Sequence, residues 1–272
     1  MTCVWAWADL GNHTLQFFNI RQYWLIMSVL SVKKFNPNWK RVFFVDKQTY
    51  DFLNSKKWIY LWDEVNIVDF KNTEYGNLYD ISIYSWPKIY SYGLLDDDIL
   101  IMDVDIVFVK KMGITDFKKI GGNLYNHMDD FISDYNSDGY SNLSHKWDYI
   151  DLVQSKIIDG DYEKLKPTSI CIIGSPIYCP KHLNKKVQQI LNHIIRVENI
   201  YGGLLPFDTY QALEEEYPIA QIAVDNGGFW QIDTSCYKHG YISEAFFDIH
   251  NGYDEPERLL NEPVFKKYII NE

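Results

Sequence analysis

The stretch Ile99-Leu100-Ile101-Met102-Asp103-Val104-Asp105-Ile106-Val107-Phe108 places two carboxylates inside an otherwise apolar run. Residues 99–102 are wholly apolar, which is typical of a strand buried on both faces in a parallel sheet. In an extended chain, residues two positions apart point to the same side. We therefore expect Asp103 and Asp105 to face one cleft at the end of this strand, where ligands collect in open α/β sheets.

Paired carboxylates of this kind suit a hard divalent cation such as Mn²⁺ or Mg²⁺. The cation would bridge the two phosphates of a nucleotide diphosphate and neutralise charge on the departing group. The competing interpretation is a solvated loop pair, because Asp-x-Asp is short and common by chance. We favour the metal site, since a buried strand would not carry two free acids without a partner.

Strand and helix patterns alternate on the N-terminal side of this stretch, which predicts a parallel sheet with helices on both faces. A helix start is indicated by Ser85 as a cap and Pro87 in the first turn. We expect strands at Thr2–Ala8, Arg41–Val45 and Val65–Asp69, and helices at Leu15–Phe35, Thr49–Ser55 and from Ser85 to about Leu95.

The C-terminal side is less regular. Residues 123–167 are polar and are interpreted as a long insertion over an active site. Beyond them we expect strands at Ser169–Ile173 and Phe229–Ile232, and helices at Lys181–Val197, Glu214–Val224 and Pro263–Ile269.

Composition narrows the classes of function. The chain has 272 residues and a formal charge of −11, which argues against a general polyanion-binding protein. One segment differs: from Arg21 to Lys57, eight basic residues face two acidic ones, a local charge of +6 that we interpret as a solvated face. The four cysteines (Cys3, Cys171, Cys179 and Cys236) form no CxxC pair and are expected to be reduced thiols of a cytoplasmic protein. The apolar run Tyr23–Val32 is too short to span a bilayer.

The residues before and around the acidic pair resemble those of a known family. A helix bearing Lys88, an acidic turn at Asp96-Asp97-Asp98, and an aliphatic strand ending in Asp103-Val104-Asp105 together resemble the DxD region of GT-A glycosyltransferases. Residues 2–8 look like the first nucleotide-binding strand of that superfamily, and residues 41–46 like the second. The resemblance implies a GT-A, Rossmann-like fold: a single domain over residues 1–272, with a nucleotide-sugar-binding half at 1–122 and an acceptor-binding half at 123–272.

Two later segments extend the resemblance. Glu215-Glu216, followed by a helix and the turn Asp225-Asn226-Gly227, is similar to the acidic pair near the reacting sugar in glycogenin-like transferases. There a carboxylate would accept the proton of the acceptor or orient sugar hydroxyls; alternatively, the acids only complement the helix dipole. His250, in Ile249-His250-Asn251-Gly252, resembles the late His-x-x-Gly segment that supplies a third metal ligand.

The resemblance therefore implies a metal-dependent hexosyl or pentosyl transferase. It would use Mn²⁺ (or Mg²⁺) and a nucleotide-sugar donor, with a UDP-sugar expected first, and a glycan, protein or modified-base acceptor. The implied residues are Asp105, Glu215 and Glu216 for catalysis; Asp103, Trp7, Asp9 and Lys88 for the nucleotide sugar; and Asp103, Asp105 and His250 for the metal.

Three alternatives remain open. A nucleotidyltransferase of related topology also needs carboxylates and Mg²⁺, but usually carries a Gly-rich basic loop where this chain has residues 9–13. A non-catalytic carbohydrate-binding protein would account for the 17% aromatic content without the acidic pair. A phage-type acceptor, a hydroxymethylated DNA base, is suggested by the +6 segment and opposed by the total charge.

Overall fold

The computed structural model describes residues 1–8, 15–76, 86–113, 117–120, 177–179, 181, 191–192, 195, 229–232 and 236–239. Strands and helices alternate through the N-terminal part, and short strands from distant segments complete the sheets. The elements are β1 (Thr2–Trp7), α1 (Leu15–Phe35), β2 (Lys40–Val45), α2 (Lys47–Ser55), the 3₁₀ turn η1 (Ile59–Leu61), β3 (Glu64–Ile67), η2 (Phe70–Asn72), α4 (Trp86–Tyr92), β4 (Ile99–Ile101), β5 (Ile106–Phe108), β6 (Phe117–Ile120), β7 (Ile177–Cys179), β8 (Phe229–Ile232) and β9 (Tyr237–His239).

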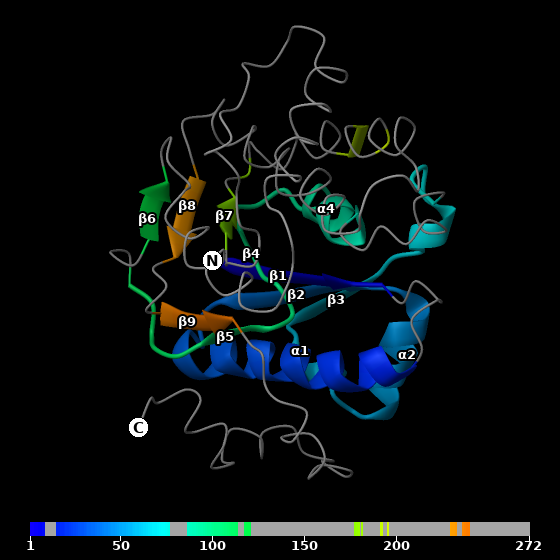
Figure 1. The fold of residues 1–272 in the computed structure, drawn as a ribbon, viewed down its shortest axis with the longest axis horizontal. Helices are drawn as coiled ribbons and strands as arrows, with labels where there is room; N and C mark the ends of the chain where they lie inside the picture. The colour runs from blue at the N-terminus through cyan, green and yellow to red at the C-terminus, as the bar shows by residue number, and fades with distance from the viewer. Residues whose placement is uncertain are drawn as a thin grey trace, which may run out of the picture.

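The main sheet has seven strands in the order β3-β2-β1-β4-β7-β8-β6 (Figure 1). β3, β2, β1 and β4 are parallel to one another, whereas the pairs β4–β7, β7–β8 and β8–β6 are antiparallel. A second, two-stranded sheet pairs β5 with β9. The predicted α/β class, with a mostly parallel central sheet flanked by helices, is confirmed.

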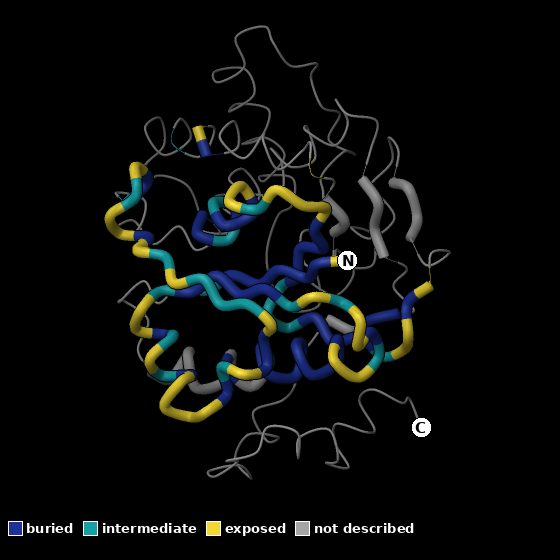
Figure 2. Tube along the Cα trace, turned by 180° about the vertical axis from the view of Figure 1, so that it is seen from behind, coloured by how far each residue is buried: buried dark blue, intermediate teal, exposed yellow. Residues whose placement is uncertain are grey.

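Alternation along the central strands explains why both faces of the sheet carry helices. Cys3 and Trp5 of β1 point to one face and Val4 and Ala6 to the other, as successive side chains of a strand must. The first pair joins a buried cluster with α1, α2 and η1, and the second joins a cluster with α4 and η2. Figure 1 shows α1 and α4 on opposite sides of the sheet, and Figure 2 shows the buried strands between them.

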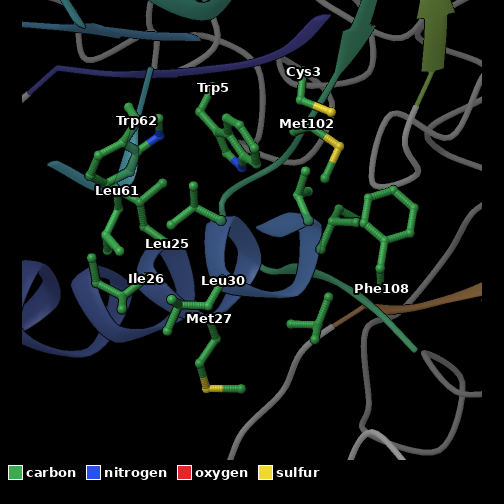
Figure 3. Close-up of a cluster of buried hydrophobic side chains, with 14 of the residues drawn as sticks. Cys3, Trp5, Leu25, Ile26, Met27, Leu30, Leu61, Trp62, Met102 and Phe108 are labelled. Carbon is green, nitrogen blue, oxygen red and sulfur yellow. The ribbon is translucent and has the colours of Figure 1, made fainter. Parts of the chain in front are cut away.

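The α1 face of the sheet is closed by large apolar side chains. Figure 3 shows Trp5 and Cys3 of β1, together with Met102 just after β4, above Leu25 and Leu30 of α1. The Trp5 indole Nε1 donates a hydrogen bond to Ser28 Oγ over 2.9 Å, so the polar atom of this buried ring is satisfied inside the core. Helix α1 is therefore attached to β1 by packing and by one buried hydrogen bond.

The predicted elements of the N-terminal part are confirmed, with ends that shift by a few residues. Helix α1 and strand β8 have the predicted bounds, and β3 covers residues 64–67 instead of the expected 65–69. Helix α2 begins earlier than expected because Asp46 caps it, its Oδ1 accepting from the Thr49 N–H at 2.7 Å. The short strands β5, β6, β7 and β9 were not predicted; each pairs with a segment that lies far away in the chain.

Other expectations fall on parts of the chain with little or no description. Within the predicted helix 181–197, the described residues Lys181, Leu191, Asn192 and Ile195 are helical. The predicted cap Ser85, the strand 169–173 and the helices 214–224 and 263–269 lie outside the described residues.

Candidate functional site

The order of the parallel strands identifies where a ligand would bind. The chain runs from β1 outward to β2 and β3, and then returns to β4 on the other side of β1. In open α/β sheets, ligands bind outside the carboxyl ends of the strands at such a reversal. Asp103 comes two residues after β4 ends at Ile101, so the acidic pair follows the strand that borders the reversal.

The path of the chain through the acidic pair differs from the prediction. The strand ends at Ile101, and residues 104–105 form a turn in which the Ile106 N–H donates to the Asp103 carbonyl at 3.3 Å. The expected extended geometry, with both carboxylates on one side of a strand, is therefore wrong. The chain turns here because β4 belongs to the main sheet, while β5, which starts at Ile106, belongs to the second sheet.

Both ends of this turn are fixed by hydrogen bonds to other elements. Before it, the Met102 N–H donates to the Val4 carbonyl of β1 at 3.0 Å. After it, the Phe108 N–H donates to Ser31 Oγ of α1 at 2.9 Å, and the Met112 N–H donates to Asn36 Oδ1 at 3.0 Å. Such support from rigid elements suits a binding site, because it holds ligand groups in place before the ligand arrives.

Sequence reasoning did not find the anchoring residues Ser31 and Asn36. Their signal was a polar residue within the buried stripe of α1 and an Asn at its end, features that also occur in ordinary helices. Only the position of β5 against α1 shows what these side chains hold.

Lys88 and Asp103 form an ion pair within the site. Lys88 lies on α4, and its Nζ is 2.7 Å from Asp103 Oδ1. The side chains are only 15% and 22% exposed, so bulk water screens this pair less than it would a surface pair. Of the residues predicted to bind the nucleotide sugar, the structure thus brings Lys88 and Asp103 into contact.

The carboxylate oxygens of Asp103 and Asp105 provide part of a site for a hard cation such as Mg²⁺ or Mn²⁺. Asp103 and Asp105 are both half-buried carboxylates in one short turn, and Mg²⁺ is commonly held by one or two carboxylates together with water and substrate phosphates. Among the described residues, no group of three His, Cys, Asp or Glu side chains is arranged to hold a metal ion. The described part of the chain thus offers two carboxylates, and the metal site stays a prediction.

Among the other residues predicted for the site, the structure describes Trp7. Trp7 is the last residue of β1, is half-buried, and packs against the cluster on the α1 side of the sheet, whereas Lys88 belongs to α4 on the other side. Its role toward a nucleobase stays a prediction. Asp9, Glu215, Glu216 and His250 lie outside the described residues.

The basic segment 21–57 is partly neutralised within the protein. Arg41 pairs with Asp63 through Nη2 and Oδ1 at 2.6 Å, and Lys40 pairs with Glu64 at 2.6 Å. Lys47 pairs with Asp51 along α2. Asp63 and Glu64 lie outside residues 21–57 and are not counted in the local charge of +6, so this charge overstates the positive surface that the segment offers to a polyanion.

Comparison with known proteins gives structural likenesses, and the one described here is distant. No protein-family model and no curated protein matches the sequence. Among solved structures, the chain is similar to one described as "PaToxG Glycosyltransferase", with 11% sequence identity and a TM-score of 0.37 over 83% of this chain and 68% of that chain. A likeness this distant does not bear on activity.

No helix in the described ranges has the length and apolar character needed to cross a membrane.

Proposed function

We propose that this chain is a metal-dependent glycosyltransferase that moves a sugar from a nucleotide-sugar donor, a UDP-sugar first, to an acceptor hydroxyl. One observation carries the proposal: the Asp103–Asp105 turn directly follows β4, at the point where the strand order reverses. The resemblance of this segment to the DxD region of GT-A glycosyltransferases supports it.

In this proposal, Asp103 and Asp105 would hold Mn²⁺ or Mg²⁺ at the donor diphosphate. The metal would supply neutralisation of the negative charge that develops on the leaving nucleotide diphosphate. Lys88 lies beside Asp103 and contributes a further positive charge for the phosphates. The chain accelerates the transfer mainly by positioning the donor and by preorganised electrostatics.

The acceptor side of the proposal rests on the sequence. Glu215 or Glu216 would accept the acceptor proton, and His250 would complete the metal site. The acceptor is a glycan, a protein or a modified base. The internal pairing of Arg41, Lys40 and Lys47 gives the DNA-base acceptor no added support.

A sugar-nucleotide panel with Mn²⁺, scored for donor hydrolysis and thermal shift, tests the proposal. We expect at least one nucleotide sugar to raise the melting temperature only when Mn²⁺ is present, because a ligand that binds the folded state stabilises it. Asp105→Asn should lower turnover by at least about a hundredfold, because changes to residues that merely support a metal ligand already cost about 10- to 100-fold.

The matched control is Asp97→Asn, the same substitution in the exposed turn that precedes β4. We expect this variant to keep the Mn²⁺-dependent shift and the turnover of the unmodified protein. If no nucleotide sugar shifts the melting temperature with Mn²⁺, or if Asp105→Asn behaves like Asp97→Asn, the proposed function is wrong. Sugar binding that survives in Asp105→Asn would instead indicate a carbohydrate-binding protein.

A further inference from the structure

The Lys88–Asp103 ion pair has a consequence for how metal binding and nucleotide binding affect each other. The Lys88 ammonium lies 2.7 Å from Oδ1 of Asp103, a carboxylate that the proposed function assigns to a divalent cation. Two cations brought to one carboxylate repel each other, and at low exposure this repulsion is only weakly screened. Lys88 and the metal are therefore alternative partners of Asp103.

We propose that Lys88 couples metal binding to nucleotide binding by exchanging Asp103 for the diphosphate. Without ligand, Lys88 neutralises Asp103; when the metal takes Asp103, the Lys88 ammonium needs a new anionic partner, and the diphosphate provides it. This inference rests on the proposed function and adds to it a positive coupling between metal and nucleotide that depends on one positioning residue.

The fixed geometry of the turn supports an exchange of partners over a movement of the carboxylate. Asp103 lies between Met102, bonded to β1, and Ile106, which opens β5. Lys88, by contrast, reaches Asp103 through a long side chain with several rotatable bonds, on the short helix α4. Changing the partner of the ammonium group therefore requires only side-chain rotation.

This coupling predicts that Lys88→Met binds Mn²⁺ more tightly, whereas the simple loss of a binding contact would weaken Mn²⁺ binding. Removing the ammonium removes the competitor for Asp103, so Mn²⁺ alone should bind Lys88→Met about fivefold or more tightly than the unmodified protein. At the same time, the gain in UDP affinity caused by Mn²⁺ should shrink by at least a similar factor, because coupling is reciprocal.

Two measurements that do not depend on turnover test the inference. Free Mn²⁺ is followed by electron paramagnetic resonance in titrations of the protein without nucleotide, and UDP affinity is measured by calorimetry with and without Mn²⁺. Lys88→Arg should restore the behaviour of the unmodified protein, since it retains the positive charge. Lys88→Gln should behave like Lys88→Met, and serves if the methionine variant does not fold.

Asp103→Asn tests whether Asp103 is the carboxylate for which Lys88 and Mn²⁺ compete. In a protein that carries Asp103→Asn, adding Lys88→Met should no longer change the Mn²⁺ affinity. If Mn²⁺ binds the unmodified protein in a manner that depends on Asp105, yet Lys88→Met and Lys88→Gln bind it equally or more weakly, the coupling is refuted and the proposed function stands. If neither the unmodified protein nor the Lys88 variants bind Mn²⁺ through Asp105, either alone or in the presence of UDP, the metal-dependent function fails, and the coupling fails with it.

Discussion

The substitution Ser31→Ala tests how β5, and with it the acidic turn, is attached to α1. Ser31 is fully buried; its Oγ accepts a hydrogen bond from the Phe108 N–H at 2.9 Å and donates one to the Ser28 carbonyl at 2.7 Å. The β5–β9 ladder does not provide a substitute acceptor. Val109 N–H donates to the Cys236 carbonyl, and because alternate residues of an antiparallel strand bond to the partner strand, the Phe108 N–H points away from β9.

The expected loss of unfolding free energy in Ser31→Ala follows from the hydrogen bond that is removed and from the helix propensity that is gained. Ser31→Ala leaves the buried Phe108 N–H without its acceptor, which costs about 1 to 3 kcal/mol of unfolding free energy. Alanine favours a helix over serine by about 0.5 kcal/mol, which offsets part of this loss. We therefore expect a net destabilisation of about 0.5 to 2.5 kcal/mol.

Urea unfolding followed by tryptophan fluorescence measures this difference, and hydrogen exchange at the Phe108 amide shows whether the bond has been lost. Ser55→Ala is the matched control: Ser55 Oγ also donates to a carbonyl three residues earlier, that of Phe52, but Ser55 is exposed. We expect the control to change stability by less than about 0.5 kcal/mol. If Ser31→Ala were as mild as Ser55→Ala and exchange at Phe108 stayed slow, the anchoring of β5 by Ser31 would be refuted.

Two further predictions concern ionisable groups away from the turn. The hydrogen bond from the Arg41 guanidinium holds the pKa of Asp63 below its ordinary value; a lowered folded-state pKa stabilises the fold above the unfolded-state pKa, and this contribution is lost as the pH falls through the folded-state pKa. Because Asp63 is 41% exposed, Asp63→Asn should cost only about 0.5 to 1 kcal/mol at pH 7, and its deficit in urea unfolding should disappear at strongly acidic pH; a deficit unchanged by acid would contradict the assignment. Burial raises the pKa of the Cys3 thiol, so iodoacetamide at pH 8 should leave Cys3 unmodified in the folded protein and alkylate it in urea, as read by peptide mass spectrometry; rapid labelling of the native protein would show that Cys3 is not buried.

The sequence predicted much of the fold because burial leaves a periodic trace in the chain. The 21 residues of α1 and the apolar run before Asp103 were long or uniform enough to reveal helix and strand. The alternation of these patterns was sufficient to predict helices on both faces of a parallel sheet. The short strands β5, β6, β7 and β9 left no such trace, since their formation depends on pairing with segments far away in the chain.

The candidate site, like the fold, was predicted from the sequence only in part. The sequence by itself determined that Asp103 and Asp105 follow a buried strand, because apolar and acidic residues are read directly from the chain. Only the tertiary structure decided that the chain turns between them, that Lys88 lies against Asp103, and that Ser31 holds β5 to α1. The physical reason is that periodicity reports which side chains leave water, whereas the partners they meet depend on how distant elements are brought together.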